Sequence, residues 1–147
     1  MPKCSDVMTR DPVCCTPQDS IVRVAEIMKE QDVGSVPVVD SADSQRLVGI
    51  VTDRDLVVKV LADNRGVERA TVQDAMTGNP ATCRDTDDVE RAVAVMAERQ
   101  VRRMPIVDAG GRLVGIIAQA DVATRVNRDQ KTGELVEAIS EPPTVRR

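Results

Sequence analysis

The segment Arg46–Leu56, RLVGIVTDRDL, decides the fold, because the chain repeats it at Arg112–Val122 as RLVGIIAQADV. Upstream of these motifs, the opening MTRDP at Met8 returns as MTGNP at Met76. Between opening and motif the first copy is two residues longer, and the extra residues fall in the polar loop Ser41–Gln45. The chain is therefore an internal duplication.

A unit of this size is too small to bury its own apolar face, so the two copies are expected to pack on each other around a pseudo-two-fold axis. A site where they meet would take residues from both copies. We divide the chain into repeat 1 at 1–62, a polar linker at 63–70, repeat 2 at 71–126 and a charged tail at 127–147. The tail contains a predicted short helix near Glu134–Ile139.

Each repeat alternates strand and helix. In the first copy, Pro12–Thr16 is predicted to be a short strand, and Ser20 to cap a helix that runs to about Gln31. Two β-branched runs, Val36–Val39 and Leu47–Val51, predict paired strands. A second helix is expected to open at Thr52 and to contain Leu56–Leu61. The predicted class is α/β (α+β), with a small β-sheet and two helices in each repeat.

The predicted helices are apolar around much of their circumference. In Ser20–Gln31, Ile21, Val24, Ala25 and Met28 share a face, and Val22 and Ile27 widen it. Leu56–Leu61 is similarly apolar, so both helices are expected to need a partner surface. We predict a homodimer.

Composition excludes several classes of function. The chain has no Phe, Trp or Tyr and a formal net charge of −4, which disfavours nucleic-acid binding. It has no His, so the commonest general base and imidazole metal ligand are missing. No metal site or catalytic constellation is evident, and we expect the protein not to be an enzyme. Without a long apolar run or a signal-peptide pattern, the cytoplasm is the default location.

The four cysteines, Cys4, Cys14, Cys15 and Cys83, form no zinc-binding spacing. Two interpretations stay open. They are buried or half-buried thiols in a reducing compartment, or Cys15 and Cys83, which occupy equivalent positions in the repeats, form a redox-linked pair.

The two motifs Gly49–Asp55, GIVTDRD, and Gly115–Asp121, GIIAQAD, follow in each copy a Met-Thr opening, an Ala- and Met-containing helix and a Pro-Val or Pro-Ile strand. In this order the chain resembles a tandem pair of cystathionine-beta-synthase (CBS) domains, the Bateman module, from about Cys4 to Val126. Its tail is similar to that of stand-alone bacterial CBS-pair proteins of the hypoxic response type. The resemblance implies intertwined repeats, a disc of four repeats in the dimer, and an adenosyl ligand in the cleft between the copies.

In the motif G-h-h-T-x-x-D, where h is hydrophobic, a buried strand runs into a helix. The hydroxyl of Thr52, the following backbone N–H groups and the helix dipole therefore meet at one anion-binding point. The resemblance implies that Asp55 and Asp121 accept hydrogen bonds from a ribose diol. Thr52 and Asp55 are also spaced as a capping box, and this second interpretation stays open.

The second copy has Ala118 where the first has Thr52, and it carries Arg103 just before its Met-Pro pair. In related modules an Arg at this position contacts ligand phosphate, so the resemblance implies the same role for Arg103. The alternative is that Arg103 is a solvated surface residue. The two sites are expected to be unequal, and whether one or both are occupied stays open. Further ligand-binding candidates, taken from the resemblance, are Arg54, Thr16, Val36, Pro37, Met104 and Pro105.

These residues predict a passive receptor. We expect a regulatory module for AMP, ADP, ATP, S-adenosylmethionine or NAD, with no obligatory cofactor and an unidentified protein target. The alternative is a structural, interaction or redox-responsive CBS-pair protein with little or no nucleotide affinity.

Overall fold

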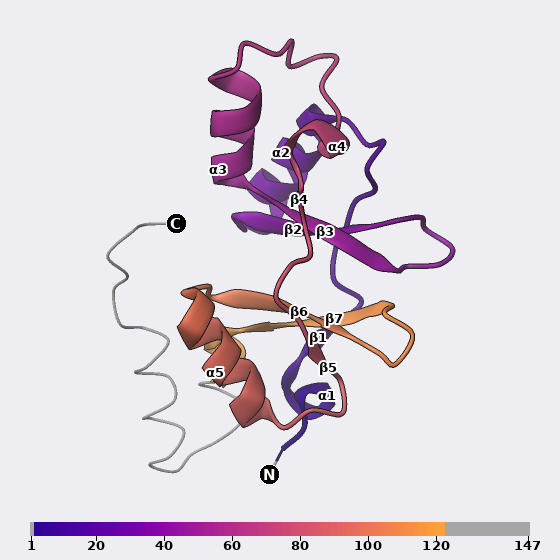
Figure 1. The fold of residues 1–147 in the computed structure, drawn as a ribbon, viewed down its shortest axis with the longest axis vertical. Helices are drawn as coiled ribbons and strands as arrows, with labels where there is room; N and C mark the ends of the chain where they lie inside the picture. The colour runs from indigo at the N-terminus through magenta and orange to yellow at the C-terminus, as the bar shows by residue number, and fades with distance from the viewer. Residues whose placement is uncertain (1, 123–147) are drawn as a thin grey trace. The chain divides into compact units, whose positions relative to one another are not determined.

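The computed structural model describes residues 2–122. Within this part the chain forms two compact units (Figure 1). The first unit is Val13–Pro80, and the second unit combines residues 2–12 with 81–122. The predicted tail at 127–147 and its helix near Glu134–Ile139 lie outside the described residues. No helix among the described residues is long and apolar enough to cross a membrane.

The first unit contains a three-stranded antiparallel sheet in the order β2-β3-β4. Its strands are β2 (Ser35–Val39), β3 (Leu47–Thr52) and β4 (Thr77–Gly78). Its helices are α2 (Ile21–Gln31), α3 (Asp53–Asp55), which continues directly as η1 (Leu56–Leu61), and α4 (Val72–Ala75). The predicted pairing of the two β-branched runs is confirmed, with Ser35 opposite Thr52.

The second unit repeats this plan with one more strand, in the order β1-β7-β6-β5. Its strands are β1 (Thr9–Arg10), β5 (Cys83–Arg84), β6 (Arg103–Val107) and β7 (Leu113–Ala118), of which β5 runs parallel to β6. Its helices are α1 (Cys4–Val7), α5 (Val89–Arg99) and α6 (Gln119–Asp121). The class is therefore mixed α/β with two small sheets, as predicted.

The units do not coincide with the repeats, because each unit takes its opening segment from the other copy. Helix α1 and strand β1 open the first repeat but lie in the second unit, where Cys4 N–H donates to the carbonyl of Asp87 at 2.8 Å. Helix α4 and strand β4 lie in the first unit, where Val72 N–H donates to the carbonyl of Asp19 at 2.9 Å. The repeats are thus intertwined through these exchanged segments.

Each unit has its own hydrophobic core. In the first, Ile21, Val24, Ile27 and Met28 of α2 pack with Val36, Val38 and Val51 of the sheet. In the second, Val89, Val93 and Met96 of α5 pack with Met104, Ile106 and Ile117. Ile27 is therefore a core residue of its own unit, whereas Val22 and Ala25 are exposed.

Local signals define the ends of α2. Ser20 caps it, with Oγ accepting from the N–H of Arg23 at 3.1 Å, as predicted. The helix ends at Asp32, whose left-handed φ of 56° lets Val33 N–H reach the carbonyl of Met28 at 3.1 Å. Gln100 ends α5 in the same way, with φ of 57°.

The prediction of a strand at Pro12–Thr16 is wrong. Only Cys15 forms a bridge, parallel to Val38. Its N–H donates to the carbonyl of Pro37 at 3.0 Å and its carbonyl accepts from Val39 at 2.8 Å. The ladder stops on both sides of this bridge because the next donors would be Pro37, towards the carbonyl of Val13, and Pro17, towards the carbonyl of Val39, and neither has an N–H.

The helix after Thr52 is confirmed, but its second part differs from a regular α-helix. The N–H of Ala62 donates to the carbonyl of Val57 at 2.8 Å, five residues back, which is π-helical bonding. Such wide turns are rare and occur frequently at functional sites.

Candidate functional site

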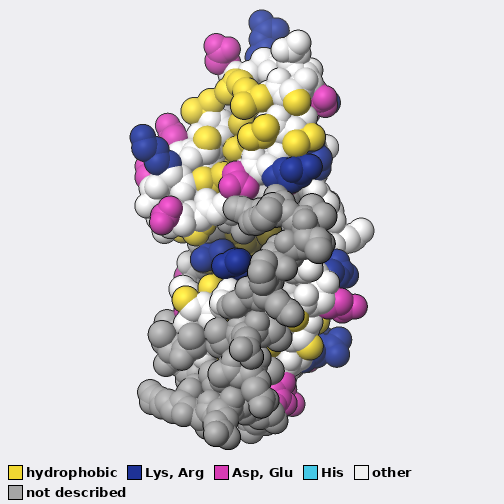
Figure 2. Space-filling view, turned by 90° about the vertical axis from the view of Figure 1, so that its left-hand side faces the viewer, with side chains coloured by type: hydrophobic (Ala, Val, Ile, Leu, Met, Phe, Trp, Pro, Cys, Tyr) yellow, Lys and Arg dark blue, Asp and Glu magenta, His cyan; other side chains and the backbone are white. Residues whose placement is uncertain are grey.

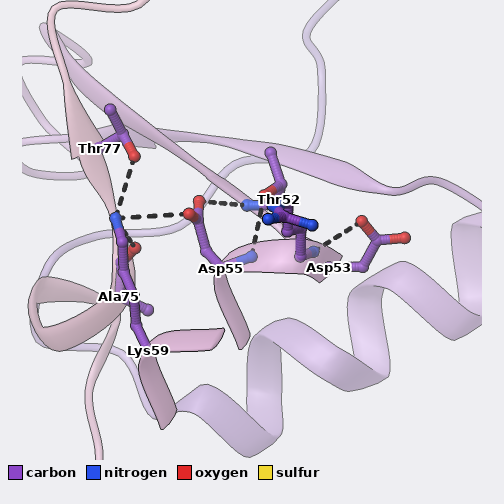
Figure 3. Close-up of polar contacts among 7 residues, drawn as sticks. Thr52, Asp53, Asp55, Lys59, Ala75 and Thr77 are labelled. Carbon is purple, nitrogen blue, oxygen red and sulfur yellow. Dashed lines mark hydrogen bonds and ion pairs between the residues drawn. The ribbon is translucent and has the colours of Figure 1, made fainter. Parts of the chain in front are cut away.

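The junction of β3 and α3 is the first candidate site. Thr52 ends the strand in an extended conformation and its Oγ1 accepts from the N–H of Asp55 at 3.1 Å. In return, Thr52 N–H donates to Asp55 Oδ2 at 3.0 Å (Figure 3). This reciprocal box fixes the direction in which the helix leaves the sheet.

The carboxylate of Asp55 uses its two oxygens differently. Oδ2 belongs to the cap, whereas Oδ1 lies 3.4 Å from Lys59 Nζ, and the side chain is only 14% exposed. An ionised carboxylate has about four acceptor positions, so two contacts leave it able to accept further hydrogen bonds. By its number of acceptor positions, the carboxylate of Asp55 is thus not used up by the cap and Lys59.

Among residues 2–122, the bond from a backbone N–H to an Asp three residues ahead recurs, both at helix starts and in turns. The part of the chain that the structure describes has six such bonds, each 2.8–3.1 Å long. The pairs are Lys3 and Asp6, Thr16 and Asp19, Thr52 and Asp55, Thr71 and Asp74, Arg84 and Asp87, and Ala118 and Asp121. The cap alone is thus sufficient to explain an Asp at position 55, and a ligand role needs separate support.

The equivalent junction of the second unit keeps the backbone geometry without the hydroxyl. Ala118 N–H donates to Asp121 Oδ2 at 3.1 Å. Gln119 N–H donates to the carbonyl of Arg102 at 3.0 Å, as Asp53 N–H does to Gly34 at 2.9 Å. The two junctions are therefore alike in backbone and different in side-chain chemistry.

Arg103 lies at this second junction, directly opposite Ala118 in the pairing of β6 with β7. Its side chain is half-buried, and its Nε is buried without a hydrogen-bond partner among the described residues. A buried N–H without an acceptor is destabilising by about 1–3 kcal/mol. An anion accepting from Arg103 would remove this penalty, so the structure adds a reason to the predicted phosphate contact.

The remaining ligand-binding candidates are divided between the two units. The first unit contains Thr16, Val36, Pro37 and Arg54, and the second contains Met104, Pro105 and Asp121. Strand pairing brings Val36 and Pro37 beside the Thr52 end of β3. The bridge at Cys15 is parallel and pairs with Val38, so it places Thr16 next to Val39. Val36 and Met104 are core side chains with 1% and 0% exposure, so only their backbone can meet a ligand without repacking. Arg54 is exposed.

Sequence reasoning missed Lys59. It lies one helical turn after Asp55, and an Asp and a Lys four residues apart on a helix are expected to interact. That spacing was the available signal. Its further contacts with Ala75 and Thr77 depend on the exchange of α4 and β4 and were not visible in the sequence.

Helix η1 exposes an apolar face. Val57, Val58 and Leu61 are 54%, 43% and 60% exposed. Figure 2 shows hydrophobic side chains gathered on this side of the unit, where Figure 1 draws the helix of α3 and η1, next to basic and acidic side chains. These three residues form what we call the η1 face.

Cys4, Cys15 and Cys83 are buried free thiols, and Cys14 is partly buried. Burial raises the pKa of Cys4 and of Cys15 to about 12, and it also raises the pKa of Cys14 and Cys83. Thiols with raised pKa carry little thiolate at neutral pH, which lowers their reactivity. Cys4 and Cys83 share the core of the second unit, whereas Cys15 lies in the first. Among residues 2–122 no group of acidic, Cys or His side chains is arranged to hold a metal ion.

Comparison with known proteins identifies the family of this chain. The family model described as the CBS domain matches residues 4–62 and 72–128. The chain is 36% identical to the Bacillus subtilis protein YlbB over 141 residues, covering 96% of this chain and 93% of that protein. It is 31% identical to hypoxic response protein 1 of Mycobacterium tuberculosis over 137 residues, covering 93% of each.

Solved structures are similar over most of the chain. CBSX2 in complex with AMP gives a TM-score of 0.74 at 31% identity, covering 87% of this chain and 100% of that one. The CBS domain pair of protein MJ0100, in complex with 5′-methylthioadenosine and S-adenosyl-L-methionine, gives 0.70 at 28% identity, covering 84% and 94%. Hypoxic Response Protein I with two coordinated zinc ions gives 0.74 at 32% identity, covering 82% and 96%.

Proposed function

Because the chain belongs to the CBS domain family and carries two copies of the domain in tandem, we propose that it is a non-catalytic regulatory module that binds an adenosyl ligand. The observation that carries this proposal is the half-buried Asp55 carboxylate at the start of α3, which retains acceptor positions beyond its cap. Solved CBS pairs at 28–31% identity were determined with AMP or S-adenosylmethionine bound, which supports the ligand class.

In this proposal the ribose diol donates to Asp55 and the N-terminal N–H groups of α3 face the ligand's negative charge. Arg103 supplies a guanidinium for phosphate at the equivalent junction of the second unit, because its Nε is buried and unpartnered among the described residues. The expectation that one ligand lies in the cleft between the two repeats stays a prediction.

Adenine would have to be bound without aromatic stacking, since the chain has no Phe, Trp or Tyr. Val36 and Met104 are buried in the cores, so we expect the base to be recognised by backbone groups, near Val36 and Pro37 or near Met104 and Pro105, together with aliphatic surface. Such binding involves no bond making, and it acts by favouring one conformation over another.

The alternative is a CBS-pair protein that acts through its surfaces with little nucleotide affinity. One observation favours it: within residues 2–122 the bond from a backbone N–H to an Asp three residues ahead occurs at six places, so Asp55 needs no ligand to explain it. In either case the exposed η1 face supports the proposal of a homodimer.

A thermal-shift screen of AMP, ADP, ATP, S-adenosylmethionine and NAD separates the two. A ligand at about 100 times its Kd adds about 2.7 kcal/mol to the free energy of unfolding, or about 5–10 °C in Tm for a chain of this size. Calorimetric or dye detection is required because Trp and Tyr are absent. If none of the five raises Tm at millimolar concentration, the adenosyl proposal fails and the alternative replaces it.

A further inference from the structure

Lys59 joins the Asp55 carboxylate to the segment that opens the second repeat. Its Nζ lies 3.4 Å from Asp55 Oδ1, 3.2 Å from the carbonyl oxygen of Ala75 and 3.2 Å from Thr77 Oγ1. Figure 3 shows the three contacts converging on this one nitrogen. All four residues belong to the first unit, although Ala75 and Thr77 come from the exchanged segment.

The three contacts occupy the donors of the ammonium. A lysine ammonium has three N–H groups and here meets three acceptors. Charge-assisted N–H···O bonds are usually about 2.7–2.9 Å long, so the 3.4 Å contact with Asp55 is loose. Lys59 therefore contacts both the helix and the α4–β4 segment. The position of this segment thus influences the position of the ammonium group.

The position of the ammonium matters for Asp55. Oδ2 is committed to the cap through Thr52 N–H, so Lys59 is the group that orients and partly neutralises Oδ1. A ribose diol that donates to this carboxylate needs it in one rotamer. Without Lys59, Oδ1 would have to be held by water or by the ligand itself.

Resting on the proposed function, we propose that Lys59 is a positioning residue for ribose recognition, and that it makes diol binding at Asp55 depend on docking of the segment Ala75–Gly78 against η1. Coupling between two binding events is reciprocal, so the bound diol also stabilises the docked segment. After Gly78 the chain continues through Asn79 and Pro80 into the second unit. The segment that Lys59 contacts thus leads into one of the two chain connections between the units, the other being at Pro12 and Val13.

A thermodynamic cycle tests the proposal. Calorimetry measures the Kd of AMP and of 2′,3′-dideoxy-AMP, which lacks the diol, for wild type, Lys59→Met, Lys59→Arg and Lys29→Met. Methionine keeps an apolar stem of similar length, arginine keeps the charge, and the exposed Lys29 on α2 is the matched control for charge removal.

We expect wild type and Lys29→Met to bind AMP at least tenfold more tightly than the dideoxy compound. In Lys59→Met we expect this ratio to fall to within about threefold of unity, and in Lys59→Arg to recover in part. A residue that only stabilises the fold would lower both affinities together and leave the ratio unchanged. Equal ratios in wild type and Lys59→Met would overturn the role of Lys59. If wild type itself does not distinguish the two compounds, the ribose assignment in the proposed function fails, and this proposal fails with it.

Hydrogen exchange provides the second readout. AMP is expected to slow exchange of the β4 amides in wild type and not in Lys59→Met. Thr77→Val removes one acceptor of the ammonium, so it should weaken AMP binding several-fold in wild type and have no further effect in Lys59→Met. An AMP-induced protection of β4 that persists in Lys59→Met contradicts the coupling.

Discussion

A β-carbon added at Gly49 would stand 2.7 Å from the carbonyl oxygen of Thr77. The glycine of the motif thus makes room for β4, the exchanged strand that pairs with β3. In the second unit a β-carbon at Gly115 would stand 2.9 Å from the carbonyl oxygen of Thr9 on β1. The motif glycines allow the exchange of segments between repeats.

Gly49→Ala should therefore weaken the docking of β4. We expect the free energy of unfolding to fall by about 1–3 kcal/mol, because a backbone carbonyl must move to make room. Gly66→Ala is the control, since nothing lies within 4 Å of its β-carbon position, and it should be neutral or slightly stabilising. Urea unfolding of both variants measures the difference, and equal stabilities would contradict the steric explanation.

The two aspartates are expected to contribute unequally to ligand binding. Asp55→Asn keeps a capping oxygen but removes the charge, and we expect a loss of roughly tenfold or more in affinity for adenine nucleotides. Asp121→Asn should have a smaller effect, because Ala118 supplies no hydroxyl at its junction. Calorimetry on folded protein decides the ranking. Loss of binding in Asp121→Asn alone would reverse it, and no effect of either would leave capping as the role of Asp55.

Arg103 should favour phosphorylated ligands. AMP, ADP and ATP are expected to bind more tightly than adenosine, with affinities that fall as salt is added. Arg103→Gln should remove most of this preference, whereas Arg99→Gln, on an exposed position of α5, should keep it. Equal affinities of wild type for adenosine and AMP would refute the phosphate contact.

The η1 face should mediate dimerisation. Light scattering of wild type is expected to give about twice the 15.9 kDa mass of one chain. Leu61→Lys places a charge on the 60% exposed Leu61 and should give monomers. Val67→Lys, at a less exposed valine outside the helix, serves as the control and should remain dimeric. A monomeric wild type at micromolar concentration would refute the proposal.

The buried thiols should make stability fall at alkaline pH. Burial raises the pKa of Cys4 and Cys15 from 9.0 to about 12, so between these values the unfolded chain ionises and the folded chain does not. The unfolded state then binds fewer protons, and the free energy of unfolding decreases by about 1.4 kcal/mol per pH unit for each thiol. Urea unfolding in reductant at pH 8, 9 and 10 should show a shallower decline in Cys4→Ala and Cys15→Ala. An identical decline in these variants would contradict the assigned cause.

The sequence by itself determined the duplication, the class and the local elements. Helix α2 follows from the Ser20 cap and its apolar spacing, and the pairing of β2 with β3 follows from two β-branched runs joined by a polar loop. The capping geometry at Thr52 and Asp55 was also within reach, because it is made by residues three apart. These signals depend only on residues close together in the chain, so they can be detected in a single sequence.

Only the tertiary structure decided which segments pack together. The sequence places α1 in the first repeat and α4 in the second, yet each lies in the other unit, because hydrogen bonds such as that from Val72 to Asp19 join residues far apart in the chain. The contacts of Lys59 with Ala75 and Thr77 exist through that exchange. The wrong prediction of a strand at Pro12–Thr16 also concerns tertiary contacts. A strand needs several consecutive paired residues, and in the described structure this segment pairs through one bridge, at Cys15. Contacts between residues distant in sequence depend on tertiary packing, and no local sequence pattern predicts them.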